Sequence, residues 1–461
     1  HESRAHRSRR RESAGPSRKE DMTSTTPAAG TTGDSASVEL VVDGTARQLP
    51  VVPATEGNDG IVVSSLLKDT GLVTVDPPGF TNTASCQSEI TYIDGDQGIL
   101  RYRGYPPIEQ LADSSTFLEV AYLLIHGELP SPAELSAFEE RVNRHTLVPE
   151  GFRAFLSSFP RGGHPMSILA SAVNALATYY PPESLDPHDP EAVELATVLI
   201  LAKIRTITSY LHRATRDEPL MYPDYARGYV DDFLRMTFSR PYEQWESDPV
   251  LVSAMDKLLI LHADHEQNCS TSTVRIVGSS NATLYASVAA GINALSGPSH
   301  GGANEAVLTM LESIRSGDDS VETFMKKVKN KEAGVRLMGF GHRVYKSYDP
   351  RAAIVKKHAD AVLGQLGAKD ELLDIARGLE EIALSDDYFV ERKLYPNVDF
   401  YTGLIYKAMG FSPAMFTPLF ALGRMPGWIA QWREMMNDPQ TKIGRPRQVY
   451  TGPTERDYVP L

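Results

Sequence analysis

Residues 192–212 read AVELATVLILAKIRTITSYLH, and this long apolar-rich stretch indicates a buried helix rather than a strand. Residues 372–383 repeat the signal, because their apolar side chains recur at spacings of three and four. Strand patterns nearly vanish beyond residue 105, and residues 106–461 are predicted to be helical. No repeat of 20 to 50 residues is present, which disfavours a solenoid. We therefore expect a mainly α, multi-helical protein.

Two strand-turn-strand patterns precede the helical region. Residues 38–42 and 45–52 flank Asp43-Gly44, and residues 90–93 and 99–102 flank a second turn. They predict a small β module over residues 37–105. Residues 1–36 are rich in Ser, Thr, Arg, Gly and Ala, so a disordered N-terminal arm is expected there. Met22 resembles a native start, which makes residues 1–21 upstream sequence in this interpretation.

Charge and cysteine content restrict the class of protein. The chain carries 46 basic and 59 acidic residues, a net charge of −13, which argues against general binding to nucleic acid or to an anionic membrane. No apolar run reaches the length of about 18 residues that a spanning helix needs. Only Cys86 and Cys269 are present, so neither a disulfide framework nor a cysteine zinc site is possible. A cytoplasmic protein is expected.

The chemistry is expected in clusters, because the histidines are too numerous to be informative singly. Four segments combine histidine, carboxylate, arginine or glycine residues in an unusual density. They are LHADHEQN (261–268), GPSHGGANE (297–305), GFGHRVYK (339–346) and YPNVDF (395–400).

The first two segments each allow two interpretations. His262 and His265 share one helical face and could bind a metal, but no third ligand is obvious, and an anion-binding or structural role is favoured. Residues 297–301 match the GxSxG nucleophile elbow of serine hydrolases, which would make Ser299 the nucleophile. The preceding stretch reads as a helix rather than a strand. His300, between glycines and before a helix start, is the preferred acting group.

The other segments indicate an anion site with an acid–base group. A Gly-x-Gly-His turn lies in the most basic window of the chain, just before Asp349-Pro350-Arg351, which favours a phosphate or carboxylate ligand. Neither a complete GxGxxG nor a P-loop occurs. Asp399 has apolar and aromatic neighbours. Burial of Asp399 among them would raise its pKa and make it a better base. Arg424 lies among apolar residues and needs an anionic partner, and Arg445 and Arg447 add two guanidinium groups.

Together these segments resemble the citrate synthase family. Residues 339–351, GFGHRVYKSYDPR, fit the family signature, and further blocks follow in family order. The resemblance covers about residue 37 to the C-terminus. It implies a two-lobed helical subunit, with a small lobe inserted at roughly 310–415, that works as a homodimer or a hexamer of dimers. The blocks are 262–275, 297–305, 395–403, 416–432 and 445–452.

The implied reaction condenses oxaloacetate with acetyl-CoA and hydrolyses citryl-CoA to citrate and CoA, the first step of the tricarboxylic acid cycle. No metal or redox cofactor is implied. By motif position, Asp399 would remove a proton from the acetyl methyl group, and His300 would donate to the thioester oxygen. His342 would polarise the ketone of oxaloacetate and protonate the new alkoxide.

The resemblance also assigns the binding groups. Arg351, Arg424 and Arg445 would bind the carboxylates of oxaloacetate, with His265 as a further donor. Arg445 would come from the neighbouring subunit, and Arg447 could replace it. Lys346 and Arg336 would receive the phosphates of CoA.

Three alternatives remain at this point. Within the family, 2-methylcitrate synthase uses propionyl-CoA, although its bacterial members usually lack the N-terminal β module. That module resembles the longer bacterial branch, in which some members form hexamers and are inhibited by NADH. Outside the family, a serine hydrolase at Ser299 and a non-catalytic protein that binds CoA or oxaloacetate are the other hypotheses.

Overall fold

The computed structural model describes residues 36–76, 79–105, 108–317, 319–366 and 371–460. The chain divides between Val75 and Asp76 into two compact units. The disordered arm predicted for residues 1–36 lies outside the described residues, apart from Ala36.

The first unit is a small antiparallel sheet with one short helix. It contains β1 (Ser37–Val42), β2 (Thr45–Val52), β3 (Gly60–Ile61) and α1 (Leu66–Thr70), with strand order β1-β2-β3. Val42 lies opposite Thr45, so Asp43 and Gly44 form a two-residue hairpin turn. Both have positive φ, 49° and 74°, as a type I′ turn requires. The predicted Asp-Gly hairpin is confirmed.

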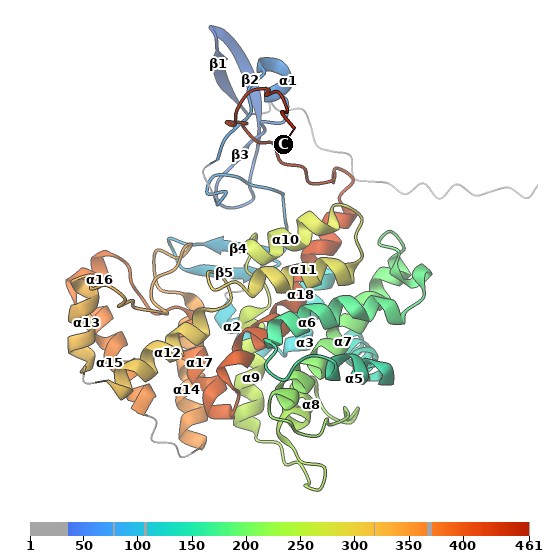
Figure 1. Cartoon of the computed structure of the whole chain (residues 1–461), viewed down its shortest axis with the longest axis vertical. Helices are drawn as coiled ribbons and strands as arrows, with labels where there is room; N and C mark the ends of the chain where they lie inside the picture. Colours follow the sequence, from blue (N-terminus) through green and yellow to red (C-terminus); the bar gives the residue numbers. More distant parts are fainter. Residues whose placement is uncertain (1–35, 77–78, 106–107, 318, 367–370, 461) are drawn as a thin grey trace, which may run out of the picture. The chain divides into compact units, whose positions relative to one another are not determined.

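The second unit is almost entirely helical, and the mainly α prediction is confirmed. Its helices of moderate length pack around a few long buried ones (Figure 1). The bounds are β4 (Thr91–Asp94), β5 (Ile99–Tyr102), α2 (Ile108–Ser114), α3 (Phe117–His126), α4 (Pro132–Arg144), α5 (Glu150–Ser157), α6 (Pro165–Leu176), η1 (Ala177–Tyr179), η2 (Pro182–Leu185), α7 (Pro190–Thr215), α8 (Tyr229–Phe238), α9 (Pro249–His262), α10 (Cys269–Gly278), α11 (Leu284–Leu295), α12 (Ala303–Ser316), α13 (Val321–Lys329), α14 (Pro350–Gln365), α15 (Glu371–Ser385), α16 (Asp387–Glu391), α17 (Val398–Met409), η3 (Pro413–Met415) and α18 (Phe416–Asn437).

The second hairpin, β4–β5, belongs to this helical unit, so the predicted β module of residues 37–105 was too long. Leu100 and Tyr102 are fully buried in the helical core. The Tyr102 hydroxyl lies 3.1 Å from the carbonyl of Ile260 and 3.2 Å from that of Asp264. Strand patterns reveal a hairpin but not the core that receives it, which is why the boundary was misplaced.

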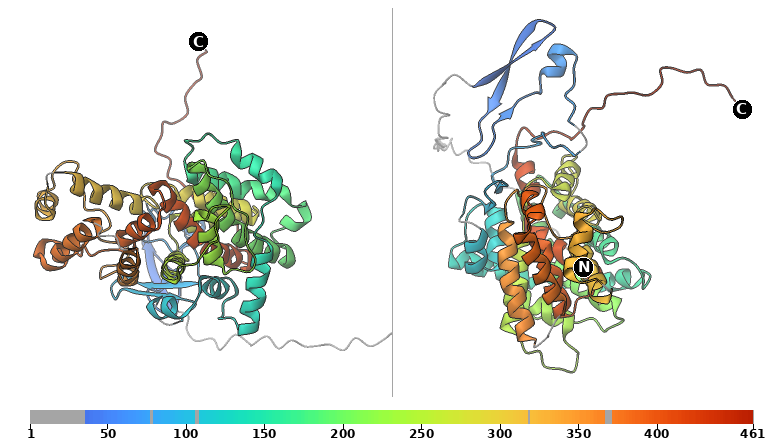
Figure 2. Two further views of the ribbon diagram at one scale, coloured as in Figure 1. Left: turned by 90° about the horizontal axis from the view of Figure 1, so that it is seen from below. Right: turned by 90° about the vertical axis from the view of Figure 1, so that its left-hand side faces the viewer.

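The helix α7 contains the predicted stretch 192–212. Asp189 accepts the Glu191 N–H and caps its first turn, Pro190 follows at the first helical position, and nearly every residue from Ala196 to Arg213 is buried. None of the helices in the described ranges is long and apolar enough to cross a membrane. In Figures 1 and 2, α13, α15 and α16 gather at one side of this unit. The inserted small lobe at roughly 310–415 stays a prediction.

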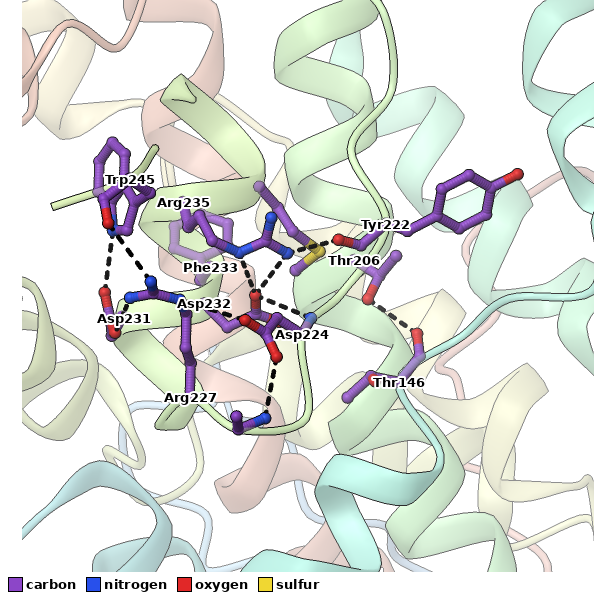
Figure 3. A network of polar contacts seen from close by, with 12 residues as sticks. Thr146, Thr206, Tyr222, Asp224, Arg227, Asp231, Asp232, Phe233, Arg235 and Trp245 are labelled. Carbon is purple, nitrogen blue, oxygen red and sulfur yellow. Dashed lines mark hydrogen bonds and ion pairs between the residues drawn. The ribbon is translucent and has the colours of Figure 1, made fainter. Parts of the chain in front are cut away.

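A polar network fixes α8 and the loop before it (Figure 3). The buried Asp232 carboxylate accepts the Arg235 Nε–H at 2.9 Å and the Asp224 backbone N–H at 3.1 Å. Next to it, Asp231 accepts from Arg227 at 3.0 Å. No residue that the sequence predicts for the site takes part in these bonds, so the network serves the fold.

The helix α18 runs through the middle of the second unit and is buried on nearly all sides (Figure 1). Pro426 interrupts its internal hydrogen bonding. The next residue, Gly427, donates its N–H to the Ala263 carbonyl at 3.0 Å instead. This bond joins α18 to the turn after α9, where His265 lies.

Replacing Gly427 with alanine is expected to destabilise the protein. The new Cβ would lie 2.2 Å from the Ala263 carbonyl oxygen and 2.5 Å from the Asp264 carboxylate. The backbone can move away from such a contact only at a cost in free energy. Overpacking of this kind costs about 1–3 kcal/mol, so the melting temperature should fall by several degrees in calorimetry. Gly364→Ala in α14 is the matched control, because nothing lies within 4 Å of its Cβ position. Equal melting temperatures for both variants would contradict the steric account.

Candidate active site

Five segments of the second unit converge on one site. They are the turn after α9, the loop before α12, the turn before α14, the start of α17 and the middle of α18. The helices that hold them are in mutual contact, α9 with α14 and α18, and α17 with α12 and α14. The rings of His265 and His342 have centroids 5.4 Å apart. The fold therefore brings together clusters that the sequence separates by up to about 160 residues.

The turn that carries His342 is fastened to the segment that carries Asp399. Gly341 donates its N–H to the Tyr395 carbonyl at 2.8 Å, and the Asn397 side chain donates back to the Gly341 carbonyl at 2.9 Å. Gly341 has a φ of 74°, a conformation that side-chain-bearing residues rarely adopt. The third and fourth sequence segments thus form one substructure.

The His342 ring is held in one tautomer. Its Nδ1 accepts the backbone N–H groups of Val344 at 3.0 Å and Tyr345 at 3.2 Å. The hydrogen of the neutral ring is therefore on Nε2, which can donate. Burial, aided by the Arg351 charge, lowers the pKa of His342 to about 4, so the ring is neutral at pH 7.

The two histidines near the end of α9 have different environments. His265 Nε2 lies 3.2 Å from the Tyr345 hydroxyl, and burial holds the pKa of His265 well below its usual value. His262 Nδ1 lies 2.7 Å from the Leu258 carbonyl, to which it donates, and burial lowers its pKa to about 3. Among the residues that the structure describes, no group of three or more His, Cys, Asp or Glu side chains is placed to hold a metal ion. The metal interpretation of this pair gains no support.

Arg351 is held rigidly at the start of α14. Its Nε and Nη2 both donate to the Asp349 carboxylate at 3.0 Å, and the residue is 3% exposed. Asp349 also caps α14 by accepting the Arg351 N–H, and it accepts the Val398 N–H at 3.0 Å. One carboxylate therefore fixes the guanidinium and joins α14 to α17.

Arg424 is buried with hydrogen-bonding capacity to spare. It is 1% exposed, its Nε donates to the His262 carbonyl, and its Nη1 has no partner among the described residues. Burial lowers the pKa of Arg424 to about 10, against the charge of Asp264. Burial of a guanidinium group in this state costs free energy unless an anionic ligand pairs with it. Asp264, also buried, was not predicted from the sequence as a site residue.

Asp399 lies in the first turn of α17, which Asn397 caps by accepting the Asp399 N–H at 3.0 Å. Burial raises the pKa of the Asp399 carboxyl to about 6, and the Arg351 charge opposes that rise. The group is thus a stronger base than an exposed carboxylate while still ionised at pH 7.

His300 is oriented by a residue that sequence reasoning missed. Its Nε2 lies 2.9 Å from the Ser270 hydroxyl oxygen and accepts the Ser270 N–H at 3.4 Å, while Trp428 Nε1 donates to the same hydroxyl at 3.2 Å. Burial lowers the pKa of His300 to about 4. Ser270 lies within the block 262–275, but nothing in its spacing marked it.

The structure around Ser299 does not match the nucleophile elbow of serine hydrolases. Ser299 is exposed and follows the helix α11 rather than a strand. Gly301 instead allows a close approach, since a Cβ there would lie 2.3 Å from the Leu295 carbonyl oxygen. The glycines around His300 serve tight packing, and the serine-hydrolase hypothesis is abandoned.

Four predicted residues lie outside this cluster in the described part of one chain. Arg445 and Arg447 are exposed in the extended segment after α18. Lys346 and Arg336 are exposed, and Lys346 Nζ donates to the Arg343 carbonyl at 3.0 Å. Their proposed roles depend on a second subunit or on CoA.

Comparison with known proteins identifies the family. The family described as citrate synthase, C-terminal domain, matches residues 79–447. The chain is 61% identical over 413 residues to citrate synthase 1 of Mycobacterium tuberculosis (strain CDC 1551 / Oshkosh), covering 90% of this chain and 95% of the relative. The crystal structure of citrate synthase from Pyrobaculum aerophilum has a TM-score of 0.75 at 36% identity, covering 89% of this chain and 97% of that one.

A second solved structure contains ligands. It is the ternary complex of carboxymethyl coenzyme A and oxaloacetate with citrate synthase from the thermophilic archaeon Thermoplasma acidophilum. Its TM-score is 0.74 at 31% identity, and the match covers 82% of this chain and 97% of that one. Since these matches extend through the segments that carry the clustered residues, the chain belongs to the citrate synthase family.

Proposed function

We propose that this site condenses oxaloacetate with acetyl-CoA and hydrolyses the citryl-CoA product to citrate and CoA. The observation that carries the proposal is the meeting of a carboxylate of raised pKa, Asp399, with two buried guanidinium groups, Arg351 and Arg424. A carbon acid needs such a base, and a dicarboxylate needs such cations. The relative solved with oxaloacetate and a CoA analogue supports both substrates.

Oxaloacetate would bind between α14 and α18. The unpartnered Nη1 of Arg424 and the fixed Arg351 would bind its carboxylates, with His265 as a further donor. His342 Nε2–H would donate to the ketone oxygen, because Nδ1 is already occupied by two backbone N–H groups.

The condensation then follows as a balanced proton relay. Asp399 removes a proton from the methyl group of acetyl-CoA while His300, which contacts Ser270 through Nε2, donates a hydrogen bond to the thioester oxygen. The enolic carbon attacks the ketone carbon, and the alkoxide takes the His342 proton. Water then attacks the thioester and gives a proton back to His342, while the CoA thiolate leaves with the proton that Asp399 took from the methyl group. Citrate and the CoA thiol are released, and both residues return to their starting states. Lys346 and Arg336 are proposed to bind the phosphates of CoA.

Thiol release tests the function directly. The purified protein is given oxaloacetate with acetyl-CoA or with propionyl-CoA, and free thiol is measured with a chromogenic disulfide reagent. We expect rapid release with acetyl-CoA that requires oxaloacetate. A preference for propionyl-CoA would indicate a 2-methylcitrate synthase, which the names of the relatives do not favour. No release with either would reject catalysis and leave a binding protein.

We also propose that the enzyme is at least a homodimer and works in the cytoplasm. The latter rests on its net charge of −13 and its two free cysteines. Dimerisation fits a groove between α6 and α11 whose lining is dominated by small side chains, since such residues allow helices of two subunits to approach closely. The lining residues are Ala170, Ser171, Asn174, Ala286, Ala289, Ala290 and Asn293.

Arg445 is proposed to complete the site of the neighbouring subunit, because it is exposed in an extended segment. Co-expression of Arg445→Ala with Asp399→Ala tests this. Each variant alone should be nearly inactive, yet the mixed dimer would contain one intact site, so about a quarter of the activity should return. Arg447→Ala is the control and should remain active alone. No recovery in mixed dimers would place Arg445 in its own subunit's site or outside any site.

A further inference from the structure

Glu380 is a buried carboxylate to which the proposed reaction gives no role. It lies on α15 and is 4% exposed. Its Oε1 accepts from the Tyr348 hydroxyl at 3.3 Å, and its Oε2 accepts from the Tyr401 hydroxyl at 2.7 Å and from Lys356 Nζ. The three donors come from the turn before α14, from α17 and from α14 itself.

The two tyrosines lie close in the chain to the groups proposed for the reaction, Arg351 and Asp399. Tyr348 directly precedes Asp349, which holds Arg351 through two hydrogen bonds. Tyr401 lies two residues after Asp399 and is fully buried. Glu380 is thus attached to both segments from a third helix.

Several hydrogen bonds join the turn before α14 to the segment that carries Asp399. Besides the bonds of Gly341 with Tyr395 and Asn397, the Val398 N–H donates to Asp349 Oδ2 at 3.0 Å. The bonds from Glu380 to Tyr348 and Tyr401 add a further connection, which comes from a third helix, α15.

The energetics favour a rigid cluster. A buried carboxylate is stable only when charged and neutral donors satisfy it, and hydrogen bonds to a charged group are stronger than those between neutral groups. Burial and the hydrogen bond to Glu380 raise the pKa of Tyr401, so its hydroxyl remains a donor at neutral pH. Both tyrosines are therefore held in place by the Glu380 carboxylate.

We propose that Glu380 is a positioning residue for the reaction, which holds Asp399 at a fixed distance from Arg351 by binding Tyr348 and Tyr401 together. The inference rests on the proposed roles of Asp399 and Arg351. Its consequence is catalytic because a base displaced by about 1 Å from the carbon acid can lose about 100-fold in rate.

Tyr401→Phe is the most direct test, since it removes one hydroxyl and keeps the ring. We expect kcat to fall about tenfold or more while the KM for oxaloacetate changes less than threefold, because proton abstraction and not binding is disturbed. With trideuterated acetyl-CoA, the isotope effect on kcat should rise, since proton removal becomes slower relative to the other steps.

A pH profile reports on distance separately from stability. The charged groups that act on Asp399 are Arg351 and Asp349 at the start of α14 and Arg424 on α18. Arg351 lowers the pKa of Asp399, and a longer distance weakens that effect. The acid limb of kcat/KM should therefore move to higher pH in Tyr401→Phe.

Two further variants complete the design. Tyr105→Phe is the matched control, because Tyr105 makes a tyrosine–carboxylate bond of the same 2.7 Å length to Glu128 away from the site. It should keep wild-type kcat and pH profile. Glu380→Gln should lower kcat, as Tyr401→Phe does. The fold-loss of kcat in the double variant should be smaller than the product of the two single fold-losses, because both substitutions act through one contact.

Specific results would overturn the proposal. Tyr401→Phe with an unchanged kcat, or with a loss that a lower folded fraction fully explains and an unshifted pH profile, would reduce Glu380 to a structural residue. Independent multiplicative effects of Glu380→Gln and Tyr401→Phe would do the same. Failure of the proposed function is distinguishable, because the wild-type protein would then release no thiol from acetyl-CoA with oxaloacetate, whatever Tyr401→Phe does.

Discussion

Turnover of the Asp399→Ala variant is expected to fall by about three orders of magnitude while both substrates still bind. General-base catalysis contributes about 10²–10⁴-fold, and Asp399 combines partial access with a pKa that burial raises to about 6. Asp349 is already engaged by Arg351 and Val398, and Asp264 is fully buried. Steady-state kinetics with thiol detection measures the loss, and calorimetric titration of oxaloacetate checks binding.

The wild-type pH profile belongs to the same prediction. Asp399 must be ionised to act, and its pKa is raised to about 6, so kcat/KM should decline as the pH falls below about 6. Asp374→Ala, at an exposed position of α15, is the control and should retain both turnover and this acid limb. Near-normal turnover in a folded Asp399→Ala protein would remove Asp399 from the mechanism.

Arg424→Leu is expected to raise the KM for oxaloacetate by about 100-fold and to change that for acetyl-CoA little. Arg424 offers its free Nη1 in a buried setting, where each charge-assisted bond to a carboxylate contributes about 1.5–3 kcal/mol. Leucine leaves the His262 carbonyl without its Nε–H donor and removes the charge that faces Asp264, so some loss of stability is expected beside the change in KM. Initial rates over a matrix of both substrate concentrations separate the two KM values.

Arg424→Lys sharpens this test. Lysine keeps the charge but lacks the planar fork of donors, so its KM for oxaloacetate should fall between those of the wild type and Arg424→Leu. A melting curve on each variant accompanies the kinetics. If both substrates were affected equally in Arg424→Leu, and the melting temperature dropped, the change would be a folding defect.

Local sequence signals predicted the helical class and the groups that meet at the site. The apolar run at 192–212 lies within α7, and the Asp43-Gly44 hairpin forms as expected, because periodicity and turn chemistry are local properties. His265, His300, His342, Arg351, Asp399 and Arg424 lie on segments that the structure brings together. That set depended on the family resemblance, because no spacing rule joins residues so far apart.

What the sequence could not predict are the partners reached only through tertiary packing. Ser270 contacts His300 across 30 positions, and Glu380 reaches Tyr348 and Tyr401 from α15. Neither lies in a motif with a known spacing. The β4–β5 hairpin was placed in the wrong unit for the same reason, since its alternating pattern gives no information on whether a sheet or a helix covers it.

The fixed protonation of the site has a consequence for metabolism. His342 and His300 have pKa values of about 4, and Asp399 has one of about 6, so between neutrality and mild acidity no histidine of this pair changes charge. The proposed flow of acetyl carbon into citrate would then change little with pH near neutrality. Below about pH 6 it would fall through protonation of a single carboxylate, Asp399.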